Sequence, residues 1–428
     1  MLRPFVFGCG QGATKAMIAC IEAGVFRKED CVVVNSTTKD IPHEYRANAI
    51  VISDDPDAGC GKVREAAKAL MNSYIKSHPE TLNKLVTDDY AYVHILTTSE
   101  GASGSGSSVV LAQYLNKMNV PTIITIITGF ESDIKGLQNT INYFKDLQGG
   151  DFVVNTISNR RYLAEAKNNI FVAESLANEG IAKTIKIINA HDLVECEQNI
   201  DDTDHYKIIT NPGFLFAGEV EITDRIKNVD QFNKLIGDMI DNTTSLDFEP
   251  SATKVGVYMN MSEENLEVID TSFSVIKKKL CWKGFPEIFI HKQYDKSQPQ
   301  FIRVIASGIN LPKAELMGMY EKFQQNSAQM SAGEDDFFNA LDGMDTNIAD
   351  SNKKNNKKVD FFDQFDQDQS EEVTRVLSRN RRGGRRFSTG TQSNDNGGEA
   401  PAKGNNKFTT KNNGNGAEVM TEETLKKF

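Results

Sequence analysis

The sequence predicts an α/β protein with a Rossmann-like, doubly wound parallel sheet, a long central helix and a second, smaller α+β domain. Three observations predict this class. β-Branched apolar runs alternate with helix-compatible stretches over the first 160 residues, glycine-rich turns join strands to helices, and a long stretch around residue 180 has apolar residues at helical spacing. A chain of 428 residues that is 39% hydrophobic is long enough to bury two cores.

Six short runs are almost continuously apolar, as strands covered on both faces of a sheet require. They begin at Pro4, Cys31, Ala49, Tyr92, Pro121 and Phe152. The helices predicted between them span residues 11–23, 62–76, 107–117 and 134–147. This alternation predicts parallel strands joined by helical crossovers.

Residues 164–196 contain no proline and a single glycine, Gly180, so they predict one long central helix. Beyond it, strands are predicted from Ala252, Glu287 and Gln300, with helices at 229–240 and 263–279. We therefore divide the folded part into a first domain at 1–165, a central helix at 166–198 and an α+β domain at 199–325.

The composition changes after residue 325, where Asn, Asp, Lys, Gly, Ser and Gln dominate. Such a segment buries too little apolar surface to offset its ordering entropy, so residues 326–428 are predicted to form a disordered tail. Two fragments, 334–344 and 359–368, set a phenylalanine pair among carboxylates, and a basic cluster follows at 379–386. They indicate motifs for an adaptor or a DNA-binding partner; the alternative is a solubilising tail.

The formal net charge of -11 argues against broad binding of nucleic acid or of a membrane surface. The six cysteines lack zinc-ligand spacing and indicate reduced thiols, and no residue is assigned as a metal ligand. The sequence has no apolar window of membrane-spanning length, so we expect no membrane insertion and a cytoplasmic protein.

Two glycine-rich stretches, "FGCGQGATKAM" at 7–17 and "SEGASGSGSS" at 99–108, each stand between a predicted strand and a predicted helix. A linker would not lie between two core elements. Glycines permit close backbone approach, and a helix N-terminus offers unpaired N–H groups and the positive end of its dipole. Because the carboxyl ends of parallel strands share one edge, the two turns predict one phosphate-binding site, against the alternative of two tight turns.

Neither stretch contains G-x-G-x-x-G or the Walker pattern. Residues 35–37, after the second predicted strand, are Asn, Ser and Thr. A nicotinamide-dependent enzyme would need an acidic residue there to hold the ribose, so that class is disfavoured.

Residues 100–106, "EGASGSG", resemble the G-G-G-T-G-[ST]-G turn of the tubulin and FtsZ superfamily. Other segments resemble the family's motifs in the same order: "VVNSTTKD" at 33–40, "GFESDIK" at 129–135, "ISNRRYL" at 157–163, "ESLANEG" at 174–180 and "NIDDTD" at 199–204. The resemblance spans residues 4–320 and favours a divergent prokaryotic or phage branch, similar to TubZ or PhuZ. Glu100 and Thr37 depart from the family pattern.

The resemblance implies a site for GTP or GDP with Mg²⁺. The implied nucleotide-binding residues are Gly10, Gln11, Gly12, Asn35, Gly101, Ala102, Ser103, Gly104, Ser105, Gly106, Glu131, Lys135, Asn159 and Asn178. Glu131 is implied at the ribose, Lys135 near the phosphates, and Asn159 and Asn178 at the base. Taken singly, Asn178 also fits an exposed helix residue and Lys135 a solvated lysine.

The implied catalytic residues are Asp201 and Asp204, which the next subunit of a filament would present to the γ-phosphate. Their task would be to orient the attacking water and to help hold a cation. The alternative reading of the same loop is an acidic helix cap.

The resemblance thus implies a GTPase that polymerises head to tail and positions or segregates plasmid or phage DNA in a bacterial cytoplasm. The ending "TEETLKKF" lacks the adaptor-binding peptide of division FtsZ proteins, which disfavours a division-ring protein without removing it. A filament scaffold that binds nucleotide without hydrolysing it is the other open alternative, favoured by Glu100 and Thr37.

Overall fold

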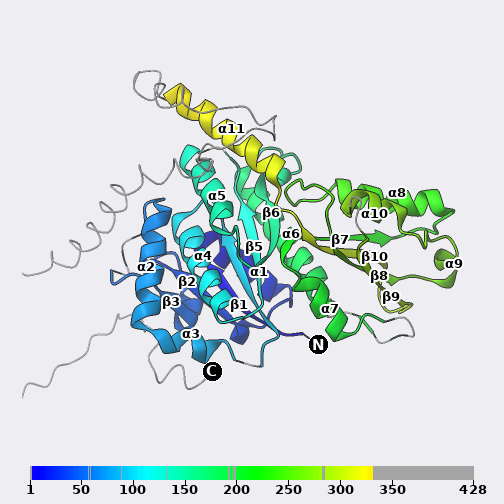
Figure 1. Cartoon of the computed structure of the whole chain (residues 1–428), viewed down its shortest axis with the longest axis horizontal. Coiled ribbons are helices and arrows are strands. Elements are labelled where there is room, and N and C mark those ends of the chain that lie inside the picture. The colour runs from blue at the N-terminus through cyan, green and yellow to red at the C-terminus, as the bar shows by residue number, and fades with distance from the viewer. Residues whose placement is uncertain are drawn as a thin grey trace, which may run out of the picture.

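The computed structural model describes residues 2–330, except 56, 58, 88, 132, 191, 192, 195, 197, 198 and 282–284. Its strands form one ten-stranded sheet in the order β3-β2-β1-β4-β5-β6-β7-β10-β8-β9 (Figure 1). The motifs predicted at 334–344, 359–368 and 379–386 lie outside the described residues. The predicted tail boundary falls inside the last helix, which continues to Met330.

The first half of the sheet is parallel throughout, as the alternation of strands and helices predicted. Its strands are β1 (Pro4–Cys9), β2 (Cys31–Asn35), β3 (Ala49–Val51), β4 (Tyr92–Thr98), β5 (Thr122–Thr128) and β6 (Val153–Ser158). Almost every residue in them is buried, because helices cover both faces. The predicted fold class is confirmed.

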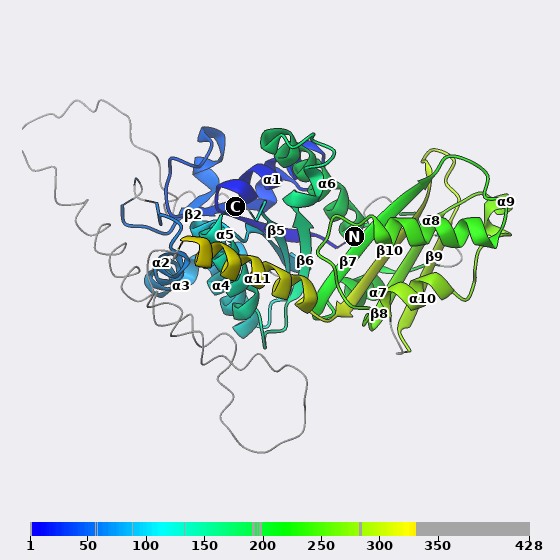
Figure 2. The ribbon, with the colours of Figure 1, turned by 90° about the horizontal axis from the view of Figure 1, so that it is seen from above.

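The helices form two layers, one on each face of the sheet (Figure 2). One layer contains α1 (Gln11–Glu22) and α6 (Ile170–Asn189). The other contains α2 (Arg64–Ser77), α3 (Pro79–Leu85), α4 (Ala102–Lys117) and α5 (Ile134–Asp146). Short 3₁₀ turns are η1 (Lys28–Asp30), η2 (His43–Asn48) and η3 (Asn159–Tyr162).

The C-terminal half extends the same sheet. Its strands are β7 (Gly213–Ile222), β8 (Lys254–Asn260), β9 (Glu287–Gln293) and β10 (Gln300–Ile309), and β10 is antiparallel to both β7 and β8. Its helices are α7 (Asp202–Ile209), α8 (Val229–Asp241), α9 (Glu263–Leu266), α10 (Ser274–Leu280) and α11 (Lys313–Met330). Among the described residues, β7, α3, α7 and α11 are elements that the sequence patterns did not predict.

Three predicted helix boundaries were wrong, each for a local reason. The central helix is shorter than 164–196, because the Asn169 side chain caps its start and Ala190, in the left-handed region at φ 49°, ends it. The helix predicted at 263–279 is two helices, with Phe273 at φ 49° before the second. Helix α4 begins inside the glycine-serine stretch, where the Ser107 hydroxyl donates to the Ser103 carbonyl at 2.6 Å.

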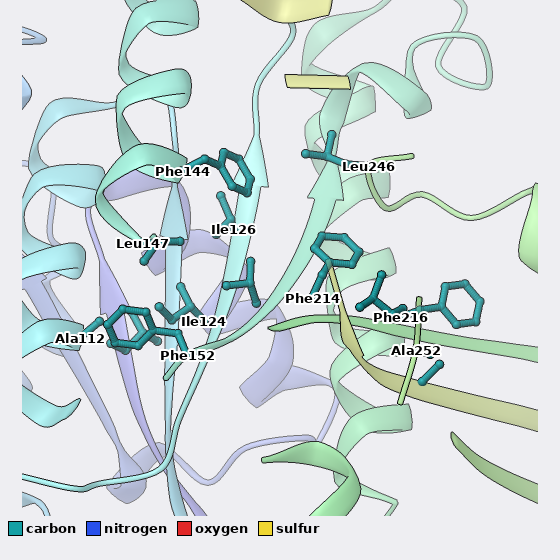
Figure 3. Close-up of a cluster of buried hydrophobic side chains, with 14 of the residues drawn as sticks. Ala112, Ile124, Ile126, Phe144, Leu147, Phe152, Phe214, Phe216, Leu246 and Ala252 are labelled. Carbon is teal, nitrogen blue, oxygen red and sulfur yellow. The ribbon is translucent and has the colours of Figure 1, made fainter. Parts of the chain in front are cut away.

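One apolar core joins the two halves of the chain (Figure 3). Ile124 and Ile126 of β5 lie in it together with Phe144 of α5. Phe214 and Phe216 of β7 extend the same core into the C-terminal half. This shared packing fixes α7, which precedes β7, relative to the glycine turns. No helix of the described part is long and apolar enough to span a membrane.

Candidate functional site

The two glycine turns meet between β1 and β4, where the order in which the strands are added to the sheet changes direction. From β1 the chain builds outward to β2 and β3, then returns to place β4 on the other side of β1. The crevice at the carboxyl ends of two such strands is where open α/β sheets bind ligands. The turn at 9–12 follows β1 and the turn at 99–104 follows β4, so both reach this crevice.

Backbone contact between the turns requires glycine at two of the predicted positions. Gly10 has φ +82°, and a Cβ atom there would lie 2.9 Å from the Cα and N atoms of Gly104. A Cβ atom at Gly104 would lie 2.5 Å from the carbonyl oxygen of Cys9. The structure therefore brings the two turns together as predicted.

Helices α1 and α4 both start at this junction. Their N-cap residues, Gly10 and Gly101, provide no side-chain hydrogen bond to the first turn, and neither first turn contains an acidic residue. Two helix N-termini with uncapped N–H groups then point their positive dipole ends at one crevice. The arrangement suits an anion such as phosphate.

Asn35, at the end of β2, lies beside the same junction. Its Oδ1 accepts the N–H of Ser36 at 2.8 Å, and the Ser36 hydroxyl shares a hydrogen bond of 2.6 Å with that of Ser103. The Asn35 residue is fully buried, and its Nδ2 has no hydrogen-bond partner among the described residues. A buried amide donor without a partner is costly, so it is a candidate ligand group.

A third loop, 59–62, also contacts the glycine turns, and sequence reasoning missed it. Cys60 is buried against Ala102, and its thiol interacts with the hydroxyls of Ser36 and Ser103. The Asn139 side-chain amide ties the loop to the second turn, donating to the Lys62 carbonyl at 3.1 Å and to the Glu100 carbonyl at 3.0 Å. The signal available was "GCGK" at 59–62, which runs into the start of a predicted helix.

Glu100, the acidic departure from the family pattern, turns its carboxylate toward the loop after β5. It accepts the N–H of Glu131 at 3.1 Å, and a Cβ atom at Gly129 would lie 2.0 Å from the carboxylate. Burial is the main cause that raises the pKa of Glu100, and the neighbouring charge of Asp133 adds to it. The structure therefore holds an acidic group beside the second glycine turn in an environment that raises its pKa.

Glu131 and Lys135 lie at the start of α5, beside Glu100. The Glu131 side chain is only 4% exposed and forms ion pairs with Arg160 at 3.1 Å and with Lys322 of α11. The Lys135 N–H binds the capping carboxylate of Asp133 at 3.3 Å. Glu131 thus forms ion pairs with two cationic side chains from other elements. Its predicted role at the ribose did not include these ion pairs.

Asn159 and Asn178 come from η3 and α6. The Oδ1 of Asn159 is buried and has no hydrogen-bond partner among the described residues. Asn178 is half-buried on α6, one turn after Glu174, which pairs with Lys15 of α1 at 3.7 Å. Both residues therefore belong to elements around the crevice, and Asn178 lies on the side of α6 that faces α1.

Asp201 and Asp204 lie at the opposite edge of the sheet. They introduce α7, which leads into β7, and β7 starts beside the first residues of β6. Figure 1 shows α7 next to the amino terminus of the chain and far from α11. The seven residues of β4 separate the two edges by about 20 Å at roughly 3.3 Å per residue, so one chain does not bring the aspartates to the glycine turns.

Both aspartates also make local contacts. Asp201 caps α7 by accepting the N–H of Asp204 at 2.8 Å, and Asp204 pairs with Lys207 at 2.9 Å. The capping alternative is therefore realised for Asp201. The next residue, His205, is buried: its Nε2 donates to the Ile188 carbonyl at 2.8 Å and its Nδ1 accepts the Tyr258 hydroxyl at 2.7 Å, which fixes α7 on the last turn of α6.

No protein-family model matches the sequence, and no curated protein matches it. Solved structures do match. TubZ of Bacillus thuringiensis serovar israelensis, in a GTPγS-form protofilament, aligns with TM-score 0.64 and 16% identity over 77% of this chain and 93% of that chain. The fold is that of the tubulin/FtsZ superfamily.

Two further structures support this fold. TubZ of Clostridium botulinum phage c-st aligns with TM-score 0.57 and 18% identity, covering 76% of this chain and 97% of that chain. The archaeal protein CetZ2 of Haloferax volcanii, a GTPγS-bound protofilament, aligns with TM-score 0.61 and 17% identity over 76% and 100%. These likenesses concern the fold, which is the one that the resemblance of the sequence motifs implied.

Proposed function

We propose that this chain is a GTP-dependent polymerising protein whose subunits assemble head to tail and hydrolyse GTP at the contact between them. One observation carries the proposal: the glycine turns and the acidic loop at 199–204 lie on opposite edges of one rigid sheet. A site divided in this way becomes complete when a second subunit stacks on the first. Such a heterologous contact does not close on itself and therefore builds an open filament.

The nucleotide would occupy the crevice between the ends of β1 and β4. The N–H groups of α1 and α4 and the Asn35 amide would bind its phosphates, while Asn159 and Asn178 would contact the base. GTP is supported by the GTPγS-form protofilaments with this fold, and GDP by the GDP-form protofilaments of the Bacillus TubZ. Phosphoryl transfer depends mainly on positioning and on compensation of charge.

Mg²⁺ would supply that compensating charge when it is bound with GTP. Within the described part of the chain, no group of three potential ligands is placed to hold a metal by itself. The phosphates would therefore provide ligands, and Asp201 or Asp204 of the neighbouring subunit would complete the set. This chain's own task is to keep the two acidic side chains at the start of α7, a helix that the buried His205 fixes on α6 and β8.

A second candidate is a filament scaffold that binds nucleotide without turnover. Glu100 favours it, because a carboxylate beside the phosphate turn weakens the attraction for phosphate whenever it is ionised. Plasmid or phage DNA as the cargo follows from the TubZ-like resemblance and belongs to the first proposal.

The deciding experiment measures phosphate release from GTP, and in parallel from ATP, as the protein concentration is raised through the micromolar range. A rate per subunit that rises above a threshold concentration, with GTP alone, supports hydrolysis coupled to assembly. If GTP binds but no phosphate is released at any protein concentration, the result favours the scaffold. Hydrolysis at a constant rate per subunit would contradict a site shared between subunits.

A further inference from the structure

The two glycine turns bring little positive charge of their own to the crevice. Residues 9–12 and 99–104 include one acidic residue, Glu100, and no Lys or Arg. The dipole of each helix that starts there is equivalent to about half an elementary charge at its N-terminus. Bound nucleotide phosphates carry several negative charges, and phosphoryl transfer depends on compensating them. A cationic side chain from a neighbouring element would therefore favour binding.

The loop at 59–62, which contacts the second glycine turn through Cys60, contains such a side chain, Lys62. The carbonyl groups of Lys62 and Glu100 accept hydrogen bonds from the same nitrogen, Nδ2 of Asn139, at 3.1 and 3.0 Å. The Lys62 backbone is therefore held next to the turn from which α4 starts. Helices α2, α4 and α5 follow β3, β4 and β5, so all three begin at this edge, and Figure 2 shows them in one layer.

The backbone of this loop is strained. Gly61 has φ +55° and Lys62 has φ +63°, so two successive residues lie in the left-handed region. A non-glycine residue there is costly, and such strain persists where surrounding contacts hold it and is common at functional sites. Here the Asn139 amide and a hydrogen bond of 2.9 Å from the Val63 N–H to the Cys60 carbonyl hold the turn. The point from which the Lys62 side chain extends is thus fixed.

The present partner of the Lys62 ammonium group is Asp133, the N-cap of α5. The two side chains are 60% and 38% exposed, and an ion pair as exposed as this contributes little net free energy. The cap does not depend on the pair, because the Asp133 carboxylate also accepts the N–H groups of Lys135 at 3.3 Å and Gly136 at 3.2 Å. Lysine has a flexible four-carbon stem, so phosphates can draw the ammonium group away from the single carboxylate.

We propose that Lys62 is a phosphate-binding residue, whose ammonium group leaves Asp133 and binds the phosphates of the nucleotide in the crevice. This inference rests on the proposed function and adds a residue to its site. The positive charge of Lys62 also interacts with Glu100, so it offsets the carboxylate beside the second glycine turn.

The first test identifies the lysines that touch the phosphates of a bound nucleotide. The probe is GTP with an acyl group on its terminal phosphate. The amine of a neighbouring lysine attacks the acyl carbon, the bond from this carbon to the phosphate oxygen breaks, and GTP leaves as the nitrogen loses a proton and becomes an amide. Peptide mapping of the dilute full chain is expected to find the acyl group on Lys62, and excess GTPγS should prevent this labelling.

Several results of this test would overturn the inference. They are labelling of Lys135 without Lys62, no label on Lys62, and labelling of Lys62 that excess GTPγS does not reduce. Lys76, exposed in the last turn of α2, is the control for non-specific acylation. If the parent chain does not bind GTPγS, the proposed function fails and this inference with it, whereas GTPγS binding without a labelled Lys62 overturns this inference alone.

The second test changes the ion pair from either side and measures the affinity of the dilute protein for GTPγS. Lys62→Met should weaken binding about tenfold or more, since it removes a charged donor from the phosphates. Lys62→Arg should retain most of the affinity, and Lys76→Met is the matched control for the loss of one positive charge. Asp133→Asn keeps a side chain that can cap α5 and releases Lys62, so it should strengthen binding.

The double variant separates a direct contact from an electrostatic effect at a distance. If Lys62 binds phosphate, Asp133→Asn acts mainly by releasing it, so the gain in affinity should largely disappear in the Lys62→Met background. Independent effects, in which the two fold-changes multiply, would refute the proposal. Parental affinity in Lys62→Met would also refute it. Weaker binding by both single variants would contradict it as well and would show that the ion pair itself holds the loop in place.

Discussion

The carboxylate of Glu131 pairs with the ammonium group of Lys322, 191 residues further along the chain in α11. Glu131 also has a left-handed backbone, at φ 58°, and its side chain is almost completely buried. A second contact fastens the same helix, because Glu315 pairs with Arg160 at 3.0 Å and Arg161 at 3.2 Å. Helix α11, which lies against α5 in Figure 1, is thus held by loops that follow β5 and β6.

We expect Lys322→Met to loosen α11. The substitution leaves the buried Glu131 carboxylate with Arg160 as its remaining ion-pair partner, and Lys322 is 43% exposed, so the free energy of unfolding should fall by about 1–3 kcal/mol. Hydrogen exchange of the α11 amides should accelerate. Chemical denaturation and exchange mass spectrometry measure both effects, with Lys76→Met, exposed on α2, as control. Unchanged exchange in α11 would show that apolar packing alone holds the helix.

Much of this architecture could be predicted from sequence because the signals were local. Buried parallel strands are continuous apolar runs, and a strand, a glycine turn and a helix succeed one another directly at β1 and β4. The collinear motifs then indicated the tubulin/FtsZ fold, which the solved structures confirm.

The contacts of Glu131 could not be predicted, because its cationic partners come from distant segments and ion pairs leave no periodic pattern. Strand β7 was missed because only part of it is buried, so its apolar run is interrupted. The 59–62 loop was missed because two glycines flanking a cysteine define no turn on their own. Its place beside the second glycine turn depends on tertiary packing against Ser36 and Ser103.

Gly104→Ala is expected to separate the two glycine turns. The new Cβ atom would lie 2.5 Å from the Cys9 carbonyl oxygen, closer than real contacts allow, so the backbone must shift. We expect a loss of about 1–3 kcal/mol in unfolding free energy and at least a tenfold weaker binding of GTPγS. Gly318→Ala is the matched control: a Cβ there meets no atom within 4 Å, and alanine favours the helix by up to about 1 kcal/mol. Parental GTPγS affinity in Gly104→Ala would place the ligand elsewhere.

Glu100 should make nucleotide binding depend on pH. Burial raises the pKa of its carboxyl above the ordinary range, and the negative charge of bound phosphates would raise it further. Binding therefore takes up a proton, so affinity should fall as the pH rises through the raised pKa of this carboxyl. Glu100→Gln keeps an acceptor for the Glu131 N–H and removes the charge, so its affinity should exceed the parent's most at neutral pH.

The ratio of the two affinities, measured with a fluorescent GTP analogue across that pH range, cancels the titration of the phosphate itself. A constant ratio would mean that the carboxylate is too far from the ligand to sense it. Unfolding stability gives an independent check of the same environment. Because a raised folded-state pKa means that ionisation costs stability, Glu100→Gln should gain stability relative to the parent as the pH rises.

The last prediction separates capping from catalysis at the acidic loop. Asp201→Asn keeps an N-cap for α7, and Asp204→Asn keeps a polar side chain beside Lys207, so both variants should fold and bind GTP normally. If these carboxylates act on a neighbouring subunit's nucleotide, hydrolysis should drop by at least about a hundredfold while filaments persist. Asp202→Ala, in the same turn, is the control for a general loss of negative charge.

Mixing provides the decisive readout. At a GTP concentration that saturates only the parental site, the Gly104→Ala variant would be largely free of nucleotide but keep both carboxylates, whereas Asp201→Asn would bind nucleotide but lack one of them. Together they should recover hydrolysis at contacts where an Asp201→Asn subunit receives the acidic loop of a Gly104→Ala subunit. Recovery requires that one chain supplies the nucleotide and another chain the aspartate. This is expected because the length of β4 separates the glycine turns from the acidic loop within one chain. If Asp201→Asn and Asp204→Asn, each assayed without the other variant, hydrolyse GTP at the parental rate, the two aspartates have no catalytic role and act only through their structural contacts.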